Sequence, residues 1–103
     1  MITVIETWHL TTEAAENALA VLQEMDELLD DNAHHHPGWA GHARFFQHAS
    51  DPKRVTMTYP WESAEQATHL IESETPLLED FYRRYCERPR EVVFAHELPV
   101  DVE

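Results

Sequence analysis

The sequence predicts an α+β protein of the ferredoxin-like class, a four-stranded antiparallel sheet with helices on one face in the order β-α-β-β-α-β. Three observations predict it. The apolar period alternates between 2 and 3.6 in that order along the 103 residues. Residues 49–53 have turn chemistry between two strand patterns. A strand pattern ending at Trp61 leads directly into Ser63 and Gln66, which form the capping box of a helix.

The first half of the chain is expected to form a strand, a long helix and a second strand. Residues 2–10 alternate, which places Ile2, Val4 and Trp8 on one strand face. Thr11 or Thr12 then caps a helix whose apolar residues recur every three or four positions as far as Leu29. Pro37-Gly38 is expected to end this helix, and residues 39–48 to form the second strand.

The second half is expected to form a hairpin strand, a helical region and a last strand. Residues 54–61 pair with the second strand, and a short helix runs from Ala64 to about Glu72. Thr75, as N-cap before Pro76, is expected to start a further helix, which Pro89 ends. Residues 91–98 alternate as the last strand, and residues 99–103 form an acidic tail.

Composition restricts the kinds of partner. The length predicts one domain, residues 1–103. Twenty acidic against seven basic side chains give a net charge of −13, which repels nucleic acid and anionic membranes. Cys86 is the only cysteine, so no intrachain disulfide is expected. The chain shows neither a signal-like amino terminus nor an apolar run of membrane length, so we expect a cytoplasmic protein.

The predicted sheet has bulky apolar residues on both faces. Phe45 and Phe46 point to opposite sides of the second strand, and Val93 and Phe94 do the same on the last strand. Two helices can cover only one face. Because a chain this small buries relatively little surface, we expect a second copy of the chain to cover the other face, giving a homodimer.

Two short stretches carry a family resemblance. Pro37-Gly38-Trp39 before the hairpin, and Trp61-Glu62-Ser63 where strand meets helix, resemble the antibiotic biosynthesis monooxygenase domain of the dimeric α+β barrel superfamily. The resemblance implies two sheets packed face to face, with a small hydrophobic ligand in a cleft between each sheet and its helices. The superfamily includes cofactor-independent monooxygenases, haem-degrading enzymes and domains without a known substrate, so the fold alone does not define a reaction.

The favoured function is cofactor-independent oxygenation of a small aromatic or polyketide-type metabolite. A phenolic substrate supplies its own electrons once it is deprotonated, so the protein needs a proton acceptor, a stabilising cation and an apolar pocket. His42 and Arg44, placed on one face of the second strand, are the candidate catalytic residues. The candidate pocket residues are aromatic: Trp8, Trp61, Phe81, Tyr82 and Tyr85. Core packing explains the aromatic residues as well, and an ion pair explains Arg44.

Two other functions stay open. The first is a non-catalytic dimeric barrel that binds a ligand; a cleft filled by side chains would favour it over an enzyme. The second is haem binding or degradation, which the resemblance links to an asparagine, a tryptophan and an axial histidine. At the matching places this chain has Glu6 or Thr7, Leu70 and Glu79, which suit haem poorly.

The histidine run at residues 34–36, followed by His42 and His48, suggests metal binding. Adjacent histidines on one backbone segment point in different directions, however, and do not converge on a single ion. No metal site and no cofactor are therefore predicted.

Overall fold

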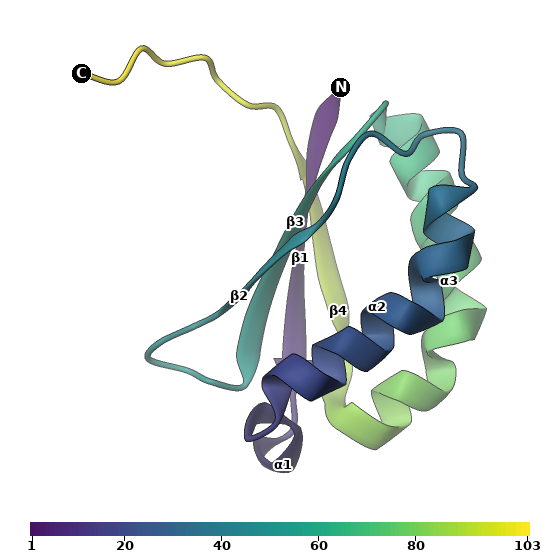
Figure 1. The fold of residues 1–103 in the computed structure, drawn as a ribbon, viewed down its shortest axis with the longest axis vertical. Coiled ribbons are helices and arrows are strands. Elements are labelled where there is room, and N and C mark those ends of the chain that lie inside the picture. Colours follow the sequence, from purple (N-terminus) through teal and green to yellow (C-terminus); the bar gives the residue numbers. More distant parts are fainter.

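The computed structural model describes all 103 residues and has the predicted order of strands. Its elements are β1 (Ile2–Leu10), α1 (Thr12–Ala15), α2 (Ala18–His34), β2 (Arg44–Gln47), β3 (Arg54–Trp61), α3 (Ala64–Tyr85) and β4 (Cys86–Ala95). The four strands form one antiparallel sheet in the order β2-β3-β1-β4. Helices α2 and α3 lie on the same face of this sheet (Figure 1). The ferredoxin-like α+β prediction is confirmed.

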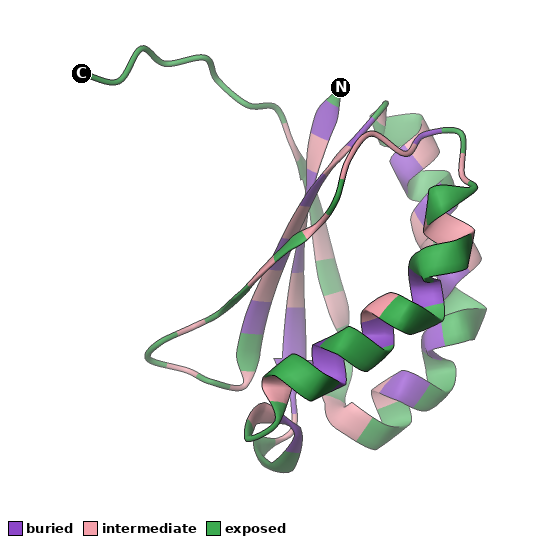
Figure 2. Cartoon of the chain, viewed as in Figure 1, coloured by how far each residue is buried: buried purple, intermediate pink, exposed green.

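The core lies between the sheet and the two long helices. Alternate residues of β1 and β3 are buried, as a strand with one covered face requires. The helices contribute a matching stripe at three- and four-residue spacing (Figure 2). Trp8, Trp61 and Phe81 are the largest apolar side chains enclosed in this core. Leu19 and Leu28 of α2 lie outside this stripe and are exposed.

The predicted first helix is two helices. Thr11 is the N-cap of α1, and its Oγ1 accepts a hydrogen bond of 3.1 Å from the Ala14 amide. The chain leaves the helical conformation at Asn17, whose φ of −127° and ψ of 38° interrupt the run before α2 begins. Asparagine side chains compete for backbone hydrogen bonds and are poor residues for a helix interior, which accounts for the break.

Strand β2 is much shorter than predicted. Only Arg44–Gln47 pair continuously with β3, and Trp39 makes a single isolated bridge with Trp61. Pro60 accounts for the gap, because it has no amide proton to donate to a neighbouring strand. Residues 40–43 therefore form a loop, and His42 belongs to this loop instead of to a strand.

Helix α3 is continuous, although a break was predicted before Pro76. Pro76 lies inside the helix, on its exposed side. Because proline has no amide proton, the Glu72 carbonyl loses its helical hydrogen bond, but Glu72 is an exposed residue. Nearby hydroxyl groups bond the preceding turn: Ser73 Oγ lies 2.6 Å from the Leu70 carbonyl oxygen, and Thr75 Oγ1 lies 3.1 Å from that of Ile71. Packing of the apolar face keeps the helix intact across the proline.

Strand β4 starts at Cys86, five residues before the predicted start, and ends at Ala95. Pro89 therefore lies within a strand and does not end the helix, which stops at Tyr85. An edge strand tolerates proline, and the β1–β4 register shifts between Thr7 and His9, close to this position. The remaining residues, 96–103, extend away from the body of the protein (Figure 1).

Gly38 allows the loop after α2 to lie against Trp61. Its carbonyl oxygen accepts a hydrogen bond of 2.9 Å from the Glu62 amide, and its own amide donates one of 3.0 Å to His36 Nδ1. A Cβ atom at this position would lie 2.2 Å from Trp61 Nε1 and 2.7 Å from Trp61 Cδ1. Only glycine fits without displacing the indole.

We expect Gly38→Ala to lower the free energy of unfolding by about 1–3 kcal/mol, because the buried Trp61 ring has little room to move. Urea unfolding followed by tryptophan fluorescence measures the loss. Gly41→Ala is the comparison, since a Cβ at Gly41 would meet mainly the Pro60 ring, at 2.8 Å from Cγ. A Gly38→Ala protein as stable as the native protein would contradict this packing argument.

Candidate functional site

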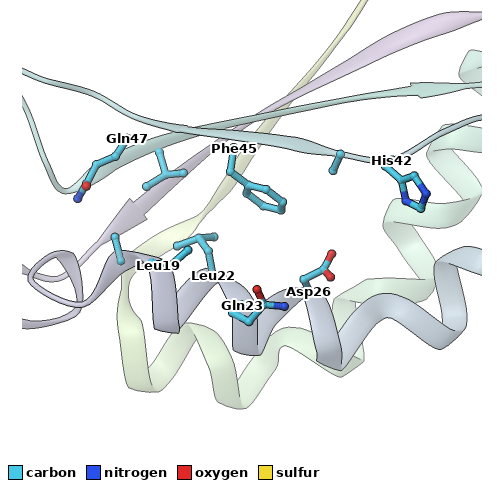
Figure 3. A pocket seen from close by; sticks show the side chains of 10 residues that line it. Leu19, Leu22, Gln23, Asp26, His42, Phe45 and Gln47 are labelled. Atoms are coloured by element: carbon cyan, nitrogen blue, oxygen red, sulfur yellow. The ribbon is translucent and has the colours of Figure 1, made fainter.

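A cleft of about 350 Å³ opens between α2 and the strands β2 and β3 (Figure 3). We call it the outer cleft. Its walls are mostly apolar, with Leu22 on the helix facing Phe45 on the strand. The residues that line it are Ala18, Leu19, Leu22, Gln23, Asp26, His42, Ala43, Phe45, Gln47 and Val55.

A smaller hollow of about 90 Å³, the inner pocket, adjoins the outer cleft. The two share Asp26, His42 and Ala43. The inner pocket reaches towards the core and is lined in addition by Met25, Leu29, Asp30, Ala33, His34, Trp39, Gly41, Met57, Tyr59, Trp61, Leu70 and Glu74. The space between sheet and helices is thus not filled by side chains.

Asp26 and His42 both line the junction of the two hollows. Asp26 projects from α2, His42 projects from the loop before β2, and both side chains face the gap between helix and strand (Figure 3). Partial burial raises the pKa of Asp26, as does the nearby Asp30 carboxylate, while His34 and His42 act in the opposite direction. His42 is exposed and so can exchange protons with water. The pair can therefore accept a proton from a ligand and pass it to solvent.

Two aromatic side chains extend the group around His42. The rings of His34 and Trp39 lie 5.9 and 5.4 Å from the His42 ring, measured between centroids. His34 and Trp39 also contact one another at 5.4 Å. This group forms one side of the junction, and sequence reasoning selected only His42 from it.

A buried ionic cluster lies at the end of the inner pocket, and sequence reasoning missed it. Glu6 is fully buried in β1 and accepts three hydrogen bonds, from Trp8 Nε1 at 3.1 Å, Tyr59 Oη at 2.5 Å and Arg90 Nη1 at 3.0 Å. Arg90 Nη2 also lies 3.0 Å from Glu74 Oε1. The cluster thus joins β1, β3, α3 and β4.

The cluster contains two carboxyl groups for one guanidinium. Burial raises the pKa of Glu74 to about 7, and the attraction of Arg90 only partly offsets this. Burial alone would lower the pKa of Arg90, but Glu6 and Glu74 outweigh it, so Arg90 stays charged. Burial and Glu6 together raise the pKa of Tyr59, which keeps its hydroxyl protonated as a donor. Burial thus brings the pKa of Glu74 close to neutral pH.

A sequence signal for this cluster exists. Glu6 takes the inward position between Val4 and Trp8, and Glu74 lies four residues from both Leu70 and Leu78 on the apolar stripe of α3. A charged residue at a core position needs a partner of opposite charge.

The candidate catalytic residues do not lie together. His42 lines both hollows, but Arg44 lines neither and is exposed, with its guanidinium carbon 5.3 Å from the centre of the Phe46 ring. The alternation of side chains along a strand predicted that His42 and Arg44 share one face. This prediction was wrong, because β2 begins only at Arg44. Asp26, instead of Arg44, accompanies His42.

Of the candidate pocket residues, only Trp61 lines a hollow between sheet and helices. Trp8 packs in the core against Phe81 and Tyr82, at centroid distances of 5.7 and 5.8 Å. Tyr85 packs on Phe81 and donates a hydrogen bond of 3.1 Å to Glu24 at the surface.

Each histidine of the run at residues 34–36 pairs with another side chain. His36 Nε2 lies 2.9 Å from His69 Nδ1, and burial together with His69 lowers the pKa of His36. His34 and His35 pair with Asp30 and Asp31 of α2. No three histidine, cysteine or acidic side chains are grouped as a metal site would require.

The residues at the positions that the resemblance links to haem are not suited to binding haem iron. Leu70 is packed in the core and Glu79 is exposed, while Glu6 is engaged by Arg90. Burial raises the pKa of Cys86 to about 11, so its thiol is a poor nucleophile and a poor metal ligand at neutral pH.

Solved structures with the same fold confirm the structural part of the predicted resemblance. A crystal structure of an antibiotic biosynthesis monooxygenase is 19% identical over 96% of this chain and all of its own, with a TM-score of 0.67. A monooxygenase of Streptomyces coelicolor, solved in complex with the ligand nanaomycin D, is 16% identical over 99% of this chain and 91% of its own, with a TM-score of 0.71. SnoaB, a cofactor-independent oxygenase from Streptomyces nogalater, is 9% identical over 97% of both chains, with a TM-score of 0.63. The chain therefore has the fold of the antibiotic biosynthesis monooxygenases.

No family model matches the chain, and no curated protein matches it either. None of its helices has the length and apolar character needed to cross a bilayer.

Proposed function

We propose that this protein binds a small aromatic or polyketide-type compound between α2 and the sheet and oxidises it with O2 without a cofactor. The observation that carries the proposal is the unfilled cleft with Asp26 and His42 at its junction. Apolar walls bind the ring system, and the polar pair provides the proton acceptor. Two proteins of similar structure, a monooxygenase and a cofactor-independent oxygenase, support the choice of reaction.

In the proposed reaction His42 accepts the proton of a phenolic hydroxyl. The electron-rich phenolate then reduces O2. One oxygen atom replaces a ring hydrogen and becomes a second carbonyl, the other leaves as water, and the ring supplies all four electrons. The Asp26 carboxylate, which lines the same junction, stabilises the protonated imidazole through its charge.

The test uses 1-naphthol as probe, because its oxidation to 1,4-naphthoquinone consumes one O2 and releases one water. We expect quinone formation above the buffer rate. His42→Ala is expected to lower it about 100-fold, since a positioned base contributes that much or more. Asp26→Asn should give a smaller loss. His35→Ala is the control, because His35 is exposed and pairs only with Asp31 of its own helix.

A native protein that takes up 1-naphthol without consuming O2 would contradict the enzymatic proposal and favour the second candidate, a ligand-binding barrel without activity. One observation favours that alternative. Arg44 lies away from both hollows, and no arginine or lysine lines either of them to stabilise a phenolate.

We further propose that a second copy of the chain covers the outer face of the sheet. Cross-strand register places Ile5 beside Val93 on that face, and Phe46 lies on the same face across β3. Val93 is 59% exposed and Phe46 is 45% exposed in the single chain. These three apolar side chains lie among threonines on that face, and a second copy of the chain is the partner that would bury them.

We expect sedimentation velocity to show a dimer at micromolar concentration. Val93→Lys should raise the dimer dissociation constant by roughly tenfold or more, because it places a cation on the apolar face of each subunit. Val100→Lys is the matched control, since Val100 belongs to the projecting carboxyl-terminal segment. Sedimentation of the native protein as a monomer would contradict the proposed dimer.

A further inference from the structure

We propose that the Glu74 carboxyl group anchors an oxygen atom of the ligand at the inner end of the site, so that the preferred ligand is an aromatic compound bearing a carbonyl or hydroxyl at its leading edge. The inference rests on the proposed function, and it names the chemical class of ligand that the site selects.

The first observation is geometric. Glu74 is 4% exposed and lines the inner pocket together with Tyr59 and Trp61. The pocket holds about 90 Å³, which suits the end of a ring and its substituent but not a whole ring system. A ligand that fills the outer cleft and reaches into the inner pocket can therefore contact Glu74.

The second observation is an unsatisfied buried atom. Glu74 Oε1 forms an ion pair with Arg90 Nη2, 3.0 Å away, but has no further hydrogen-bond partner. Buried polar atoms are nearly always hydrogen-bonded. A buried carboxyl group that lines a hollow, and whose only partner is a guanidinium shared with a second carboxylate, can bind a further polar atom from a ligand.

The third observation concerns which partner the carboxyl group takes. Arg90 is already bonded to Glu6, which also holds Tyr59 and Trp8, so one positive charge faces two acidic groups. The pKa of Glu74 of about 7 leaves it largely protonated at mildly acidic pH. A protonated carboxyl donates a hydrogen bond, and the matching ligand atom is an acceptor such as a carbonyl or phenolic oxygen.

The test compares 1-tetralone with tetralin, two probes of the same shape that differ in one carbonyl oxygen. Quenching of tryptophan fluorescence reports binding, because Trp39 and Trp61 line the inner pocket. At pH 6 we expect the native protein to bind 1-tetralone about tenfold more tightly than tetralin, the value of one buried hydrogen bond. At pH 8.5 this preference should largely disappear, because ionised Glu74 cannot donate.

Two substitutions assign the effect to Glu74. Glu74→Gln keeps a donor and should retain the preference at both pH values, whereas Glu74→Met should bind both probes equally. Other ionisable groups face the same region, namely Glu6, Tyr59 and Arg90 in the cluster and Asp26, Asp30, His34 and His42 around the pocket. Any pH dependence that they cause will persist in Glu74→Gln. Glu72→Gln, an exposed position on the same helix, is the control.

The possible results separate the two proposals. If both probes bind, and neither pH nor Glu74→Met changes the preference, the anchoring role is wrong while the ligand cleft stands. If neither probe nor 1-naphthol binds the native protein, the cleft is not a ligand site, and both the proposed function and the anchoring role of Glu74 are wrong. The pH comparison is made on the native protein, so it remains decisive even if Glu74→Met does not fold.

Discussion

Replacing Arg90 by methionine is expected to lower the free energy of unfolding by about 3–5 kcal/mol, because two buried carboxyl groups then lose their only cation. The Arg90 side chain is 4% exposed, and its guanidinium binds Glu6 and Glu74 at 3.0 Å each. Methionine keeps the apolar volume, so the loss reports charge and hydrogen bonding more than packing. A small domain has only about 5–15 kcal/mol of total stability, so the variant is close to unfolding.

Urea unfolding at pH 7 measures this effect. The matched control is Arg88→Met on the same strand, because Arg88 is exposed and lies 3.8 Å from Glu91. We expect a change of less than about 1 kcal/mol there, as for other surface pairs. The double variant Arg90→Met/Glu74→Leu removes one of the two buried carboxyl groups left without a cation, and should be more stable than Arg90→Met alone. If Arg90→Met were as stable as Arg88→Met, the cluster would not contribute to the fold.

The stability of the protein is expected to fall as the pH rises through 7, because Glu74 must ionise inside the core. Its pKa is about 7 in the folded chain against an ordinary value of 4.5. The folded state therefore binds more protons than the unfolded state between these values. The resulting stability is present in full below pH 4.5 and is lost as the pH passes 7, a difference of about 3 kcal/mol.

Glu74→Gln removes the titrating group and keeps its shape. Between pH 4.5 and 8.5 we expect the free energy of unfolding of Glu74→Gln to rise by about 3 kcal/mol relative to that of the native protein. Urea unfolding at four pH values gives both curves, and Glu72→Gln controls for the loss of one surface charge. Parallel curves for the native protein and Glu74→Gln would show that Glu74 does not titrate in this range.

Much of the fold is predictable because its signals are local. The alternation in residues 2–10 and 54–61, the turn at 49–53 and the Ser63 cap each act within a few residues, and all are present. The errors arise where tertiary packing or hydrogen bonding overrides a local signal. Pro76 should stop a helix but lies on its exposed side, and Pro60 ends the pairing of a neighbouring strand that the alternation alone extends to Trp39.

The site was less predictable than the fold. His42 and Trp61 were found because histidine and tryptophan stand out in any sequence. Asp26 and Glu74 were missed because 20 acidic residues make any single one look like part of a solvated surface. Position within the apolar pattern distinguishes Glu74 from exposed acids such as Glu72, but its pairing with Arg90, sixteen residues away on another element, requires the structure.

Because strand pairing stops opposite Pro60, residues 40–43 and residues 44–47 have different roles. The sheet holds β2 through Arg44–Gln47, while the proposed base His42 lies on residues 40–43, outside the continuous ladder. Substitutions at residues 40–43 can therefore change the shape of the cleft opening without removing a hydrogen-bonded pair between strands. The size and polarity of the cleft opening can thus be altered at residues 40–43 without changing the sheet that supports it.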